Sequence, residues 1–192
     1  MTKTRVEAFS DGVIAIIITI MVLELRVPHD TSPAALIPLV PVFVSYVLSF
    51  IFLGIYWCNH HHLFQTVERV GGGVLWANLH LLFWLSLIPF VTAWMGENHF
   101  APWTLVFYGV VLLFAAIAYT ILTFVLISLD GRDSVLAIAM GRDFKGKISL
   151  VIYLVAIPLA FVKWWLSYAL YVLVAIMWII PDRRIERTLT QS

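Results

Sequence analysis

The chain has 192 residues, of which 62% are hydrophobic, 15% aromatic and only 12% charged. This composition is typical of a polytopic membrane protein and excludes an ordinary soluble domain. The net charge of +1 gives no reason to expect a nucleic-acid partner, and the single cysteine, Cys58, excludes an intrachain disulfide and a cysteine metal framework. We therefore expect one membrane domain with short loops over residues 1–192.

The first predicted helix covers residues 6–26. Its uncharged run, Gly12 to Leu23, is twelve residues long, whereas a bilayer core needs about 20 mostly apolar residues. The charged residues at both ends must therefore lie at an interface, in water or inside protein, and such residues are functional candidates by default. A signal peptide is the alternative, but Glu7 and Asp11 interrupt its basic start and no small-residue cleavage site follows.

One face of this helix is an aliphatic stripe with a single hydroxyl group. The stripe recurs at i, i+3, i+4 and i+7 and consists of Ile16, Thr19, Ile20 and Leu23. Glu24 extends it, four residues after Ile20. Asp11 lies about 140° around the helix from Ile16, at about 100° per residue, so we expect it to face a different partner. The residues alone leave two interpretations of the stripe open, a packed core face and a pore lining.

Five further helices are predicted from the apolar runs and the helix breakers between them. They cover residues 34–63, 74–95, 103–128, 148–162 and 164–181. The last two form a tight hairpin, and each is at the short end of the spanning range. The predicted fold class is all-α, with six transmembrane helices per subunit.

The basic residues predict how these helices are oriented. Six helices place both termini on one side of the membrane. Ten basic residues are assigned to that side, namely Lys3, Arg5, Arg69, Arg132, Arg142, Lys145, Lys147, Arg183, Arg184 and Arg187. Arg26 and Lys163 fall on the other side. By the positive-inside rule, both termini are expected to be cytoplasmic.

Three consecutive histidines, His60, His61 and His62, suggest a metal site at first sight. Neighbouring helical residues point about 100° apart, however, so three in a row cannot converge on one ion. We expect no metal and no cofactor. One or two of the histidines should instead face the bundle core and form hydrogen bonds there.

Further polar residues at helix positions are Asn59, Asn78 and His80. Two interpretations of them remain open, general hydrogen bonding between helices and specific pairing with polar residues of the first helix. Those residues, Arg5, Ser10 and Asp11, lie in the same predicted half of the membrane. Since no Ser-His-Asp arrangement or carboxylate pair lies at a useful depth, we expect no enzyme.

A specific motif opens the first helix, Arg5-x-x-x-Phe9-Ser10-Asp11, and recognisable stretches follow it. They are GVIAIIITIMVLEL, Tyr56-Trp57, Asn59-His60-His61, Asn78 and the LIPF stretch of residues 87–90. The pattern resembles the RxxxFSD signature of the transmembrane protein 175 family, the lysosomal potassium channels of animals and their smaller bacterial relatives. The resemblance covers the first three helices, and the last three match only in hydropathy. A single six-helix repeat is similar to the bacterial form, which implies a homotetramer in the bacterial inner membrane.

The resemblance implies a passive potassium channel whose pore runs between four copies of the first helix. Ile16 matches the family's isoleucine constriction, and Thr19 or Ile20 and Leu23 match positions further along the pore. Glu24 is expected at the outer mouth, and potassium is the expected permeant ion. The expected polar network that holds the helix in place consists of Arg5, Ser10, Asp11, His60, His61 and Asn78.

Two other function classes remain as alternatives. A proton- or cation-coupled secondary transporter would place its substrate site at broken helices near the midplane, for which Pro89 and Pro158 are hints. A membrane-embedded enzyme using the histidines would require a bound metal.

Overall fold

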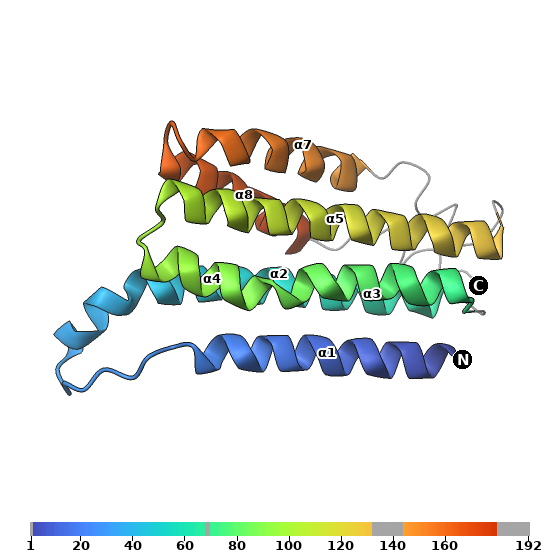
Figure 1. Cartoon of the computed structure of the whole chain (residues 1–192), viewed down its shortest axis with the longest axis horizontal. Helices are drawn as coiled ribbons and strands as arrows, with labels where there is room; N and C mark the ends of the chain where they lie inside the picture. Colours follow the sequence, from blue (N-terminus) through green and yellow to red (C-terminus); the bar gives the residue numbers. More distant parts are fainter. Residues whose placement is uncertain (1, 68–69, 132–143, 180–192) are drawn as a thin grey trace.

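The described part of the chain, residues 2–67, 70–131 and 144–179 of a computed structural model, is all helical (Figure 1). Its helices are α1 (Lys3–Leu23), α2 (Val40–Gln65), α3 (Gly72–Ser86), α4 (Ile88–Glu97), α5 (Pro102–Asp130), α7 (Phe144–Leu159) and α8 (Trp164–Ile179), with the 3-10 helix η1 (Pro33–Leu39) before α2. Four helical stretches are long and apolar enough to cross a membrane, Lys3–Leu23, Pro33–Gln65, Gly72–Glu97 and Pro102–Leu129, and Trp164–Ile179 is a shorter apolar helix. The protein is therefore a multi-pass membrane protein.

In the described part of the chain, six helical segments run side by side along the long axis of the molecule, with α3 and α4 forming one of them (Figure 1). At one end, Lys3 Nζ donates a hydrogen bond of 3.3 Å to the carbonyl of Gln65, so the start of α1 lies beside the end of α2. At the other end, Arg26 pairs with Glu97 at 2.9 Å. These contacts fix which ends of the early helices meet.

The described basic residues are divided between these two ends. Lys3, Arg5, Lys145 and Lys147 belong to the starts of α1 and α7, whereas Arg26 and Lys163 lie in the loops at the opposite end. The other basic residues in the orientation prediction, Arg69, Arg132, Arg142, Arg183, Arg184 and Arg187, lie outside the described residues.

Helix boundaries differ from the predicted ranges mainly at prolines. The predicted helix 74–95 is divided into α3 and α4, because Pro89 stands in the first turn of α4 and has no N–H group to continue the ladder. The predicted helix 34–63 begins as the 3-10 helix η1, which contains Pro38, before α2 takes over. The helix α1 ends at Leu23, so Glu24 and Arg26 lie beyond its last turn.

A chain of buried hydroxyl groups joins α2, α4 and α5. Ser49 Oγ lies 2.7 Å from Thr92 Oγ1 and 3.0 Å from the Tyr108 hydroxyl. Thr92 uses its proton to donate to the carbonyl of Ile88 at 2.6 Å, so Ser49 must donate to Thr92 and accept from Tyr108. Interhelical hydrogen bonds in a membrane are worth about 0.6 to 2 kcal/mol each. This chain therefore fixes α4 against its neighbours.

Gly96 lets α4 approach the backbone of α2. A Cβ atom at this position would lie 2.7 Å from Val42 Cα, and backbone cannot move aside as a flexible side chain can. We expect Gly96→Ala to force the helices apart and to cost about 2 kcal/mol of stability. Thermal melting of the purified protein measures this loss. Gly54→Ala is the control, because a Cβ atom there meets nothing within 4 Å, and equal melting temperatures for the two variants would contradict the prediction.

Candidate functional site: the first helix and its polar anchor

The helix α1 presents two different faces. Its buried residues pack against α2, α3 and α4 and are Val6, Ser10, Ile14, Ile17 and Met21. On the opposite side, Ile16 is 60%, Ile20 43% and Leu23 76% exposed, and Thr19 is exposed with them. The aliphatic stripe is therefore not part of the core of its own chain.

The stripe occupies the C-terminal part of a helix that is long enough to cross a bilayer. With 21 residues and a rise of about 1.5 Å per residue, α1 matches a hydrocarbon core of about 30 Å. The hydroxyl of Thr19 donates to the carbonyl of Ala15 at 2.8 Å. Because its proton is used inside the helix, the Thr19 oxygen presents only lone pairs to anything on the exposed face.

An open groove of about 500 Å³ lies between α1 and α4. Ile16, Ile20 and Glu24 line it from α1 and the residue that follows, and Pro89 and Phe90 line it from α4. Thr19 and Leu23 are not among its lining residues. The exposed side of α1 therefore has two parts. Ile16 and Ile20 face the groove, and Thr19 and Leu23 lie outside it.

Acidic side chains gather at the end of the molecule where α1 stops. Glu24 directly follows α1 and Glu97 ends α4, where it is paired with Arg26. In the loop before η1, the Ser32 backbone N–H and hydroxyl both donate to the Asp30 carboxylate, at 3.0 and 2.8 Å, and these bonds lower the pKa of Asp30. Asp30 therefore keeps its negative charge at neutral pH.

A directed line of hydrogen bonds anchors α1 to α2 and α3. His60 Nε2 donates to Asn78 Oδ1 at 2.8 Å, and Asn78 Nδ2 donates to Ser10 Oγ at 2.9 Å. Ser10 then donates to the carbonyl of Val6 in its own helix at 2.8 Å. All three side chains are buried. Three of the residues predicted for the polar network are thus brought together, and His60 is the histidine that joins them.

Asp11 has a partner of its own. Trp57 Nε1 donates to Asp11 Oδ1 at 2.9 Å, so a second bond joins α1 to α2 on the exposed side. Arg5 is exposed and lies outside the line of bonds. His61 also lies outside it, because its position about 100° from His60 directs its ring to Trp57 and its Nε2 to Gln65 at 2.8 Å. Within one chain, the line of bonds therefore contains three of the six residues predicted for the network, Ser10, His60 and Asn78.

Trp57 is the functional candidate that sequence reasoning placed differently. Tryptophans near helix ends are expected to form an interfacial belt, and nothing in the spacing links residue 57 to residue 11. The signal that was available is the Tyr56-Trp57 pair within the stretches that resemble the family. This pair indicates that the position matters but does not predict which residue Trp57 contacts.

Known proteins resemble this chain over its whole length. A family model described as endosomal/lysosomal potassium channel TMEM175 matches residues 5–89. A protein of Chryseobacterium sp. (strain P1-3) that is named a potassium channel is 54% identical over 192 residues, which is 100% of both chains. The chain belongs to the TMEM175 family. A further member, a potassium channel of Chamaesiphon minutus, is 32% identical over 188 residues, with 90% of this chain and 91% of that protein covered.

A solved TMEM175-family structure shares the fold. The crystal structure of a lysosomal potassium-selective channel TMEM175 homolog from Chamaesiphon minutus matches with a TM-score of 0.82 and 30% sequence identity, covering 94% of this chain and 97% of that one. The family model ends at Pro89. It therefore includes the stripe of α1, the anchoring bonds and the break between α3 and α4, whereas the structural match extends to the later helices.

Proposed function

We propose that this TMEM175-family protein is a passive, potassium-selective cation channel whose pore runs between α1 helices of four copies. The observation that carries the proposal is the division of α1 into an anchored face and an exposed aliphatic stripe. A membrane helix that is held by buried hydrogen bonds on one side has its other side available for a shared path. Relatives named potassium channels, at 54% and 32% identity, support the choice of ion.

Four copies are needed because one helix cannot enclose an aqueous path. A cyclic homotetramer brings four identical stripes to one axis. We place the neighbouring copy against the α4 side of the groove, which is open in the single chain, so that Ile16 and Ile20 on the α1 side border the shared path. Because charged side chains are costly in lipid, we also place the exposed Arg5 and Asp11 against the neighbouring copy.

The ring of four Ile16 side chains forms the neck of the proposed pore. Hydrophobic constrictions gate by dewetting, so the width of this ring sets conduction. An ion that enters a dry neck loses water with nothing to replace it, which costs several kcal/mol or more. Potassium holds its water less tightly than sodium and passes at lower cost. Thr19 oxygens replace part of the lost water, and Glu24 carboxylates concentrate cations at the outer mouth.

The proposed location is the cell membrane with both termini in the cytoplasm. Among the described basic residues, Lys3, Arg5, Lys145 and Lys147 share the end where α1 starts, against Arg26 and Lys163 at the other. Short loops rich in Lys and Arg stay on the cytoplasmic side. Glu24 then lies at the outer surface.

Potassium flux into liposomes containing the purified protein tests the proposal, together with chemical cross-linking to count subunits. We expect flux that follows the driving force without saturation, and a ladder that ends at four subunits. Saturable uptake coupled to a second ion would instead support the transporter alternative. A monomer that still conducts would end the shared-pore mechanism, since one stripe cannot surround an ion.

Asp11→Ala is expected to reduce the amount of assembled tetramer several-fold, with little change in the selectivity of what remains. The substitution removes a charge-assisted hydrogen bond to Trp57, and such bonds contribute about 1.5–3 kcal/mol. Trp57→Phe removes the same bond from the other side and should reproduce the loss. Size-exclusion chromatography measures assembly, and ion flux from the recovered tetramer measures selectivity. A normal tetramer with altered selectivity would show that Asp11 acts on the ion path instead.

A further inference from the structure

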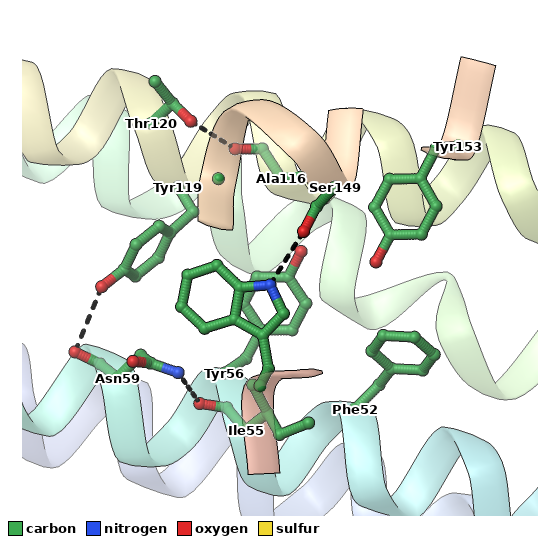
Figure 2. A pocket seen from close by; sticks show the side chains of 11 residues that line it. Phe52, Ile55, Tyr56, Asn59, Ala116, Tyr119, Thr120, Ser149 and Tyr153 are labelled. Carbon is green, nitrogen blue, oxygen red and sulfur yellow. Dashed lines mark hydrogen bonds between the residues drawn. The ribbon is translucent and has the colours of Figure 1, made fainter. Parts of the chain in front are cut away.

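A cavity of about 40 Å³ lies among α2, α5, α7 and α8, away from the exposed stripe of α1 (Figure 2). Of the eleven described residues that line it, five are aromatic, namely Phe52, Tyr56, Tyr119, Tyr153 and Trp178. None of the described residues that line it is charged. The lining therefore suits an uncharged occupant and offers no carboxylate to a cation.

Most polar groups of the wall already have partners. Ser149 Oγ accepts from Trp178 Nε1 at 2.9 Å and donates to the carbonyl of Lys145 at 2.8 Å. Thr120 donates to the carbonyl of Ala116 at 2.9 Å. These groups are satisfied by the protein itself.

Two tyrosine hydroxyls are the exception. Tyr56 is 9% and Tyr153 2% exposed, and neither hydroxyl has a hydrogen-bond partner among the described residues. Among those residues Ser167 Oγ is the fully covered side-chain atom without a partner, so both tyrosine oxygens remain open to the cavity that they line. Figure 2 shows Tyr56 entering from α2 and Tyr153 from α7, with both hydroxyls toward the middle of the view.

Asn59 adds an acceptor to the same wall. Its Nδ2 donates to the carbonyl of Ile55 at 2.8 Å, which leaves Oδ1 on the other side of the amide. Each of the two hydroxyls can donate to or accept from a small molecule, and the amide oxygen can accept. Leaving buried groups of this kind without partners is costly, and buried water is the usual remedy.

The volume of the cavity limits which molecules can occupy it. One water needs about 10–15 Å³ of such volume and two to four polar partners, so about three waters fit. A ligand pocket of about 300 Å³ or more would be needed for a larger organic molecule. We propose that the cavity binds a cluster of about three waters that joins the hydroxyls of Tyr56 and Tyr153 and the Asn59 amide, and so bridges α2 to α7.

The position of this cluster gives it a structural role. Tyr56 and Asn59 face the cavity, whereas Trp57 and His60, on the same turn of α2, bond to Asp11 and Asn78. The waters thus lie behind the turn that anchors α1. Such a cluster would be held by hydrogen bonds alone, whichever ion the protein conducts.

Tyr56→Phe, Tyr153→Phe and the double variant test the cluster by thermal melting of the purified protein in lipid nanodiscs. We expect each single substitution to lower the melting temperature by about 2–4 °C, because it removes an anchor of the waters. The double variant should lose clearly less than the sum, because either substitution disrupts the shared cluster. If the hydroxyls face dry space instead, removing one leaves the melting temperature unchanged or raises it, and this result would overturn the proposal.

Tyr171→Phe provides the matched control. Its hydroxyl donates to the carbonyl of Leu105 at 3.0 Å and does not line the cavity, so its effect should add to that of Tyr56→Phe. An equal shortfall in this control pair would overturn the shared cluster. A high-resolution density map gives a second measurement. Peaks about 2.8 Å from both tyrosine oxygens are expected, and a featureless cavity in a map that resolves other buried waters would contradict the proposal.

Discussion

Ile16→Asn is expected to raise potassium flux about tenfold and to weaken discrimination between potassium and sodium. An amide at the neck supplies hydrogen-bonding groups where a dry ring stood, so water enters and an ion keeps more of its hydration. A tenfold change corresponds to a barrier lower by about 1.4 kcal/mol. That is a modest share of the several kcal/mol that dehydration costs. Liposome flux with each ion in turn measures both effects.

Ile176→Asn is the control for placing an amide on an exposed aliphatic position. Ile176 is 53% exposed, close to the value for Ile16, but it lies on α8. Its substitution should leave flux per tetramer unchanged. An unaltered flux and an unaltered ion preference in Ile16→Asn, with normal assembly, would remove Ile16 from the neck.

The periodicity of the first helix carries most of what the sequence reveals about the site. A spacing of i, i+3, i+4 and i+7 places Ile16, Thr19, Ile20 and Leu23 on one face of any α-helix. That face is exposed in the structure, while the opposite face carries Ser10 and the core residues. Hydropathy likewise predicts the passes, because a bilayer demands long apolar segments whatever their contacts are. Such features are local and can be read from spacing.

Pairing across helices could not be predicted in the same way. The sequence offers three adjacent histidines, and the selection of His60 depends on the rotation of α2 about its own axis relative to Asn78. The bond from Trp57 to Asp11 joins residues 46 positions apart, so no local sequence pattern predicts it. The tyrosines around the cavity are similar, since Tyr56 of α2 and Tyr153 of α7 line it together only in the folded bundle. Each of these contacts is decided by tertiary packing.

The two faces of α1 have different physical requirements. A pore-lining face needs side chains that do not bind the passing ion too strongly, which favours aliphatic residues and a single hydroxyl. The anchored face must hold the helix at a fixed rotation, because a turn of one residue, about 100°, would replace Ile16 with a neighbour. Contacts between aliphatic side chains can be kept when a helix rotates slightly, whereas the hydrogen bonds through Ser10 form at only one rotation of α1. The polar anchor is therefore what sets which residues reach the axis.

Asn78→Leu should accordingly destabilise the protein by about 3 kcal/mol and lower the yield of tetramer. The leucine has a similar branched shape but breaks two interhelical bonds of about 0.6 to 2 kcal/mol each. It also leaves the buried His60 without its partner, which costs about 1–3 kcal/mol. Melting temperature and size-exclusion chromatography measure the loss. Thr123→Val is the matched control, because Thr123 is equally buried but bonds only within α5, to the carbonyl of Tyr119 at 3.0 Å.

The double variant His60→Leu with Asn78→Leu distinguishes a lost anchor from general damage to the core. Removing both partners of a buried hydrogen bond leaves neither polar group stranded, so the double variant should be less destabilised than the two single variants predict together. Additive losses would mean that the two residues act independently, and the register of α1 would then have to depend on the bond between Trp57 and Asp11. In that case Trp57→Phe, rather than Asn78→Leu, should be the variant that changes flux through the assembled tetramer.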